Sequence, residues 1–135
     1  MVKVGQVRYN DIMDKECIPL CDAINDIPGL ETSGSCCGHG KDSFKIYMPE
    51  KNIYHRNFLI LMRSLCPRYG GPIDWRVTLI MSDMTKDSLH IVISSESITG
   101  EEAFKQSLQI VENIRLCLEH ENFQKLFSVG KYLNS

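Results

Sequence analysis

Residues 75–93 read WRVTLIMSDMTKDSLHIVI and have the pattern of two consecutive strands. From Trp75 to Met81 every second residue is apolar, which is the period of a strand with one face in the core. A polar turn over 83–88 leads into a second apolar strand at 89–93. Strands joined by such a short turn pair antiparallel, so the stretch predicts a β-hairpin.

The chain on both sides of this hairpin contains further predicted helices and strands. Five further elements are expected from their apolar spacing, namely helices over 13–27, 54–65 and 100–118 and strands over 30–35 and 44–48. The order α-β-β-α-β-β-α predicts an α+β fold, a two-layer sandwich in which helices cover one face of a mainly antiparallel four-stranded sheet. We expect a single domain over 1–135, with 1–12 as a loose arm or an edge strand and 123–127 as a final helical turn.

The last predicted helix has the clearest start signal in the chain. The stretch Thr99-Gly100-Glu101-Glu102 has the pattern of a capping box, in which a hydroxyl and a carboxylate each bind a free backbone N–H. Apolar spacing places Leu108 on the buried face of this helix. Leu61 on the second helix and Ile91 on the last strand are expected to be buried with it.

Composition and charge restrict the classes of partner. The chain is 43% hydrophobic and 24% charged, as in globular proteins. Its longest apolar run, Phe58–Met62, is far shorter than the roughly 20 residues of a spanning helix, and the first residues lack a signal peptide's apolar stretch. We therefore expect a cytoplasmic protein that does not enter membranes. A net charge of −2 argues against a general nucleic-acid binder, but residues 36–76 hold seven basic and three acidic residues. That segment permits an anionic small molecule or a nucleic acid as partner.

The six cysteines divide into two groups. Structural disulfides are rare in a reducing compartment, and free cysteine packs as a small apolar residue. Four are expected to be reduced core residues, because they lie on apolar faces of predicted helices: Cys17, Cys21, Cys66 and Cys117. The adjacent cysteines Cys36 and Cys37 are instead candidate functional residues.

The segment 33–40, Ser-Gly-Ser-Cys-Cys-Gly-His-Gly, is the most distinctive chemical feature of the chain. Glycines allow left-handed backbone and close approach to a ligand, and exposed N–H groups in such a loop can bind an anion. A plain turn needs no thiols or imidazole, so the composition predicts a ligand site. The candidate ligand-binding residues are those of the loop and two bases on neighbouring strands: Ser33, Ser35, Cys36, Cys37, Gly38, His39, Lys45 and Arg76.

Other interpretations of the loop remain open. Cys36, Cys37 and His39 are suitable zinc ligands, but their spacing fits no recognised zinc module and no fourth ligand stands out, so no metal ligand is predicted. A cysteine nucleophile activated by His39 is another possibility, although no acidic partner for His39 can be named. A glycine-rich turn with incidental cysteines is the structural alternative. The residues themselves do not identify a cofactor, so the cofactor is unknown at this point.

The loop resembles a group of small uncharacterised bacterial and phage proteins. The likeness runs from Ile27–Thr32 through Ser35–Gly40 to Phe44–Ile46, and continues more loosely in Trp75–Val77 and Gly100–Phe104.

A more distant likeness is to the tRNA wybutosine-synthesising methyltransferase family, through its Ser-Ser-Cys-Ser-Gly-Arg stretch. Ser35, Cys36 and Gly38 match that stretch, Cys37 stands in place of a serine, and His39 stands in place of the arginine. The resemblance covers under a tenth of the chain. It implies a similar α+β fold and a ligand site at the loop, with S-adenosylmethionine or tRNA as the ligand.

These observations predict a small ligand-binding or nucleic-acid-modifying domain that acts through the Ser/Cys/Gly/His loop. The alternative is a non-enzymatic accessory protein that binds a metal or forms an oligomer, and a homo-oligomer is compatible with either.

Overall fold

The computed structural model describes residues 14–81 and 89–120. Its helices and strands follow the predicted order: α2 (Ile18–Asp26), β1 (Gly34–Cys36), β2 (Ser43–Pro49), α3 (Phe58–Leu65), β3 (Arg76–Met81), β4 (Leu89–Thr99) and α4 (Gly100–Glu119). Four short 3₁₀ helices join them: η1 (Lys15–Cys17), η2 (Gly38–Gly40), η3 (Glu50–Tyr54) and η4 (Pro67–Tyr69). The expected segments at 1–12, 83–88 and 123–127 lie outside the described residues.

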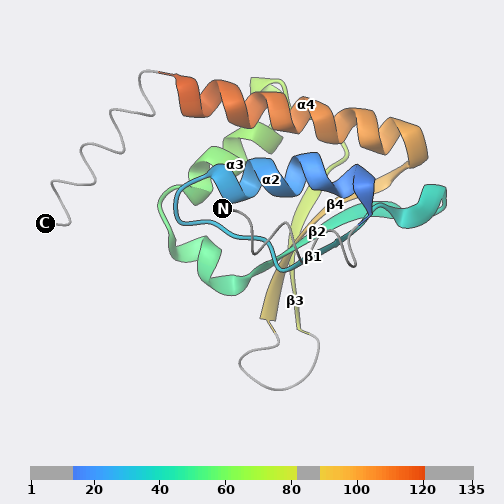
Figure 1. Ribbon diagram of the computed structural model, residues 1–135, viewed down its shortest axis with the longest axis horizontal. Coiled ribbons are helices and arrows are strands. Elements are labelled where there is room, and N and C mark those ends of the chain that lie inside the picture. The colour runs from blue at the N-terminus through green and yellow to red at the C-terminus, as the bar shows by residue number, and fades with distance from the viewer. Residues whose placement is uncertain (1–13, 82–88, 121–135) are drawn as a thin grey trace, which may run out of the picture.

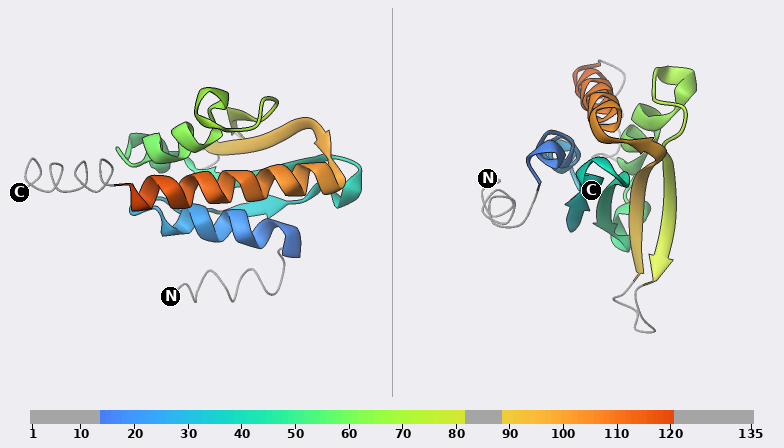
Figure 2. Two further views of the ribbon diagram at one scale, coloured as in Figure 1. Left: turned by 90° about the horizontal axis from the view of Figure 1, so that it is seen from above. Right: turned by 90° about the vertical axis from the view of Figure 1, so that its right-hand side faces the viewer.

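The strands form one antiparallel sheet in the order β1-β2-β4-β3. The three helices cover one face of the sheet, and the β3–β4 hairpin projects beyond them (Figure 1). Seen from above, α4 lies between α2 and α3 and packs against both (Figure 2). The predicted α+β sandwich of a four-stranded antiparallel sheet under a helical layer is therefore confirmed.

Alternation along β2 builds the centre of the core. Phe44, Ile46 and Met48 are fully buried beneath the helices, while the residues between them face the other side of the sheet. Leu61 and Ile91 are also fully buried, as expected. None of the helices within the described ranges has the length and apolarity needed to cross a membrane.

The prediction that Leu108 is buried is wrong, because 40% of this residue is exposed. Helix α4 instead turns Ala103, Ser107 and Ile110 into the core, a face displaced by about one residue from the expected one. The small side chains of Ala103 and Ser107 suit a face that packs between α2 and α3. Ile110 and Ile114 supply the larger buried apolar groups of that face in place of Leu108.

The apolar face of β3 is buried at one end only. Trp75, just before the strand, is buried, whereas Leu79 and Met81 are 53% and 56% exposed. The register pairs these two residues with Ile91 and Leu89, so they do point to the helical side of the sheet. The expectation that they enter the core is wrong because the helical layer does not reach this end of the hairpin (Figure 1).

The expected cysteine core is only half present. Cys17 and Cys21 are fully buried on the first helical segment. Cys66 and Cys117 are partly exposed, because each lies near the end of a helix, where the cover of neighbouring elements is incomplete.

An irregularity in β4 places the start of α4 beside η2. The register shifts between Ser43 and Lys45, where the Phe44 N–H donates to Ser95 Oγ at 2.8 Å instead of to a strand carbonyl. The Ser95 hydroxyl donates in turn to the Ile98 carbonyl at 2.5 Å. Thr99 occupies the N-cap position of α4 without a side-chain capping bond, so the predicted capping box does not form. This irregularity, a bend in β4, places the first turn of α4 in contact with η2.

Candidate functional site

The cysteine–histidine loop is a tight left-handed turn at the end of β1. Gly38, His39 and Gly40 have φ angles of 80°, 51° and 82°. A Cβ atom on Gly38 would lie 2.9 Å from the Ser43 carbonyl oxygen, so both space and backbone conformation require glycine there. A non-glycine residue at positive φ is uncommon and carries some strain, although histidine tolerates it better than most. The turn leaves the His39 side chain 71% exposed.

Asp14 joins this loop from the start of the first helical segment. Its Oδ2 accepts the Cys37 backbone N–H at 3.0 Å and lies 3.8 Å from His39 Nε2. Asp14 is not among the site residues predicted from the sequence. An acid before a helical turn is usually read as a cap, yet Asp14 makes no side-chain capping bond. No sequence pattern links it to a loop more than twenty residues away.

Asp14, Cys36 and His39 bring three metal-ligating atoms together. A carboxylate oxygen, Sγ and an imidazole nitrogen all lie within 4.8 Å of one another. The Gly38 N–H also donates to Cys36 Sγ at 3.4 Å, which helps to hold the sulfur at the turn. The cluster therefore combines a fixed carboxylate, a thiol held by the turn and an exposed imidazole.

The surroundings of the cluster shift the pKa values of Asp14 and Cys37 in opposite directions. The backbone N–H of Cys37 is the main cause that lowers the pKa of Asp14 below its ordinary value, with help from the Cys37 thiol and from His39. Burial is the main cause that raises the pKa of Cys37, and the adjacent Asp14 carboxylate raises it further. Asp14 is therefore ionised at neutral pH, while Cys37 is kept in its neutral form.

A hollow of about 720 Å³ opens beside the cluster. Asp14 and His39 line one side, and Glu101 at the start of α4 lines another. Phe104 contributes apolar surface, whereas Phe44, which also borders the hollow, is itself fully buried. The hollow exists because the bend in β4 sets the first turn of α4 against the loop.

The remaining candidates within the loop have structural positions. Ser33 is exposed, and its backbone N–H donates to the Tyr47 carbonyl in the sheet. Ser35 points to the helical side of β1, where its buried hydroxyl faces the Cys17 thiol without a hydrogen bond of standard geometry. Neither serine lines the hollow.

The two predicted basic residues lie on the sheet, on the face away from the helices. Lys45 is the register partner of Cys36, so it is next to the cluster. Arg76 lies on β3, the edge strand two places from β2, and its register partner on β4 is Ser94. Its Nε lies 3.5 Å from Glu96 Oε1. The structure thus brings Cys36, Cys37 and His39 together, with Lys45 nearby, but not Arg76.

Thiol labelling checks this assignment of the cysteines. In the native protein at pH 8 we expect Cys36 to react well before Cys17, which is fully buried and whose thiol pKa is raised by burial to about 12. At pH 8 such a thiol is ionised to the extent of roughly 10⁻⁴, and only the thiolate reacts. Mass spectrometry after timed alkylation measures the order, with the urea-unfolded chain as the control in which all cysteines react. Native-state labelling of Cys17 as fast as that of Cys36 would refute the assignment.

Comparison with known proteins identifies no relative of this chain. No protein family, curated protein or solved structure matches the chain. The resemblance of the loop to the wybutosine-synthesising family and to small bacterial and phage proteins stays a prediction, as do S-adenosylmethionine and tRNA as ligands.

Proposed function

We propose that the chain binds one divalent metal ion of the zinc class through Asp14, Cys36 and His39. The observation that carries this proposal is the convergence of their three ligand atoms within 4.8 Å. Thiolate, imidazole and carboxylate are the three ligand types that zinc uses in proteins. The metal-binding alternative from the sequence is thereby preferred, with Asp14 added and Cys37 removed from the ligand set.

The separations suit a tetrahedral ion after a small closure. Zinc bond lengths of about 2.0–2.3 Å place the ligand atoms of a tetrahedron about 3.3–3.8 Å apart. His39 Nε2 and Asp14 Oδ2 are already 3.8 Å apart. The other two separations, from Cys36 Sγ to the nitrogen and the oxygen, reach at most 4.8 Å, so they need to shorten by at most about 1.3 Å. The exposed His39 side chain has room to make that adjustment.

The charges around the site favour a cation. Asp14, Glu16 and Glu101 border the hollow, against one basic residue, Lys15. The Cys37 N–H that binds Asp14 is the kind of outer contact that orients a metal-ligating carboxylate. A hollow with this lining does not favour the anion that composition suggested, so a nucleic-acid-modifying role has less support than metal binding.

Three protein ligands leave a fourth coordination position, and the hollow gives a small molecule room to approach it. Catalytic zinc sites have this arrangement, with water or substrate as the fourth ligand, whereas structural sites are closed by four protein ligands. Zinc held by these three residues would supply the chemistry of an acidified water at neutral pH. The predicted small-ligand site is thus retained, with the metal as the group that binds the ligand.

A competition titration against a chromophoric chelator tests the proposal. Metal-free protein is expected to take up one Zn²⁺ per chain with a dissociation constant below about 1 µM, and excess Mg²⁺ should not displace it, since Mg²⁺ prefers oxygen ligands. Cys66→Ser removes a partly exposed thiol far from the loop in the chain and should leave the affinity unchanged. No uptake, or uptake that Cys66→Ser weakens, would contradict the proposed site.

A further inference from the structure

We propose that two copies of this chain associate through their β3 strands to form one continuous eight-stranded sheet. β3 lies at one edge of the sheet, where it pairs with β4. Within residues 14–81 and 89–120 no other strand pairs with its outer edge. An edge strand of this kind presents backbone N–H and C=O groups that can pair with another strand.

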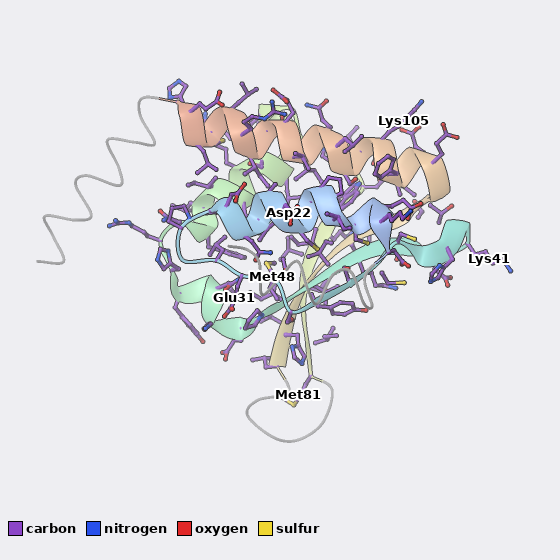
Figure 3. All side chains as sticks on the ribbon, viewed as in Figure 1. Asp22, Glu31, Lys41, Met48, Met81 and Lys105 are labelled. Carbon is purple, nitrogen blue, oxygen red and sulfur yellow. The ribbon has the colours of Figure 1, made fainter. Side chains whose placement is uncertain are left out.

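The side chains of β3 make this edge apolar on both faces. Leu79 and Met81 are 53% and 56% exposed on the helical side, and Ile80 is 41% exposed on the other. The sequence Val77–Met81 contains no charge or proline, the usual features that protect an edge from pairing. By contrast the opposite edge strand, β1, has only three residues. Figure 3 shows Met81 on the projecting hairpin, well away from Lys41 beside the cysteine–histidine loop.

The sequence of β3 is complementary to itself in an antiparallel pair. With a two-fold axis at Leu79, this residue faces its own copy, and Val77 faces Met81 of the second copy on the helical side. Thr78 then faces Ile80 of the second copy on the other side. Aliphatic and β-branched pairs of this kind stabilise neighbouring strands, and every contact occurs twice, as a two-fold interface requires.

The single charge of the strand favours an antiparallel pair over a parallel one. Arg76 is the first residue of β3. In an in-register parallel pair the two Arg76 side chains would face one another and repel. In the antiparallel pair they lie six residues apart along the interface, about 20 Å. The same pairing leaves β1 and its loop at the outer ends of the joined sheet, so it is independent of the metal site.

Sedimentation equilibrium measures the association directly. The 15.4 kDa chain is expected to have twice that mass in solution. Leu79→Lys and Leu79→Glu should each be monomeric, because each places like charges at the two-fold axis. An equimolar mixture of the two variants should recover the doubled mass through an opposite-charge pair. Leu59→Lys, which alters a 67% exposed leucine on α3, is the matched control and should remain dimeric.

A wild-type protein that stays monomeric up to about 100 µM would overturn the proposal. So would a mixture of the two Leu79 variants that remains monomeric, or dissociation by Leu59→Lys. Circular dichroism checks that the variants are folded. Should they not fold, hydrogen exchange of the wild type decides instead: the β3 amides must lose protection on dilution, and protection that is independent of concentration would contradict the dimer.

Discussion

Cys36→Ser is expected to lower the affinity for Zn²⁺ by at least about 100-fold. Loss of an outer contact to a metal ligand already costs about 10–100-fold, and this substitution removes the only sulfur of the proposed ligand set. The same competition titration measures the effect. The melting temperature should stay within a few degrees of the wild type, because Cys36 is partly exposed and outside the core.

Cys37→Ser is the matched control for this substitution. Its thiol is adjacent in sequence, but its role in the proposed site is to hold Asp14 through the backbone N–H, which serine retains. We expect its affinity for Zn²⁺ to remain within about tenfold of the wild type. A loss as large as that of Cys36→Ser would show that both cysteines bind the metal and that no coordination position is left for a ligand. Unfolding of metal-loaded Cys36→Ser would show instead that the cluster serves the fold.

Leu61→Ala is expected to lower the free energy of unfolding by about 2–5 kcal/mol. The side chain is fully buried in α3, so truncation removes apolar contacts and leaves a cavity. Leu59→Ala, on the same helix but 67% exposed, should change stability by less than about 0.5 kcal/mol. Urea unfolding of the wild type and the two variants measures both effects, provided that the dependence of the unfolding free energy on urea concentration is the same for all three. Equal destabilisation by the two substitutions would mean that the face of α3 toward the core is wrongly assigned.

The elements of the fold could be predicted because their periodicities are local. Alternation gave β2, β3 and β4, and three- and four-residue spacing gave the helices. The rotation of α4 could not be predicted in this way. It depends on how α4 packs between α2 and α3, which is a property of the packed surfaces, so apolar spacing alone wrongly predicts that Leu108 is buried. The exposure of Leu79 and Met81 likewise depends on where the helical layer ends.

The candidate site was partly predictable for the same reason. The composition of the loop identified Cys36, Cys37 and His39, which are close because they are consecutive or nearly so. Asp14 reaches them only through the folded chain. The alternation along β2 predicts that Lys45 points away from the core, and the structure places it on that face. Alternation along β3 makes Arg76 a candidate for the same site as Lys45. Sequence order does not reveal that β4 lies between β2 and β3 and so keeps Arg76 away from the loop.

X-ray absorption at the zinc edge reports the atoms bound to the metal, and so it tests the proposed ligand set itself. The proposed site predicts one sulfur at about 2.3 Å and nitrogen or oxygen atoms at about 2.0–2.2 Å, four neighbours in all. Replacing Cys36 by serine should remove the sulfur shell. A wild-type spectrum with only nitrogen and oxygen neighbours, or with more than one sulfur, would contradict the ligand set of Asp14, Cys36 and His39.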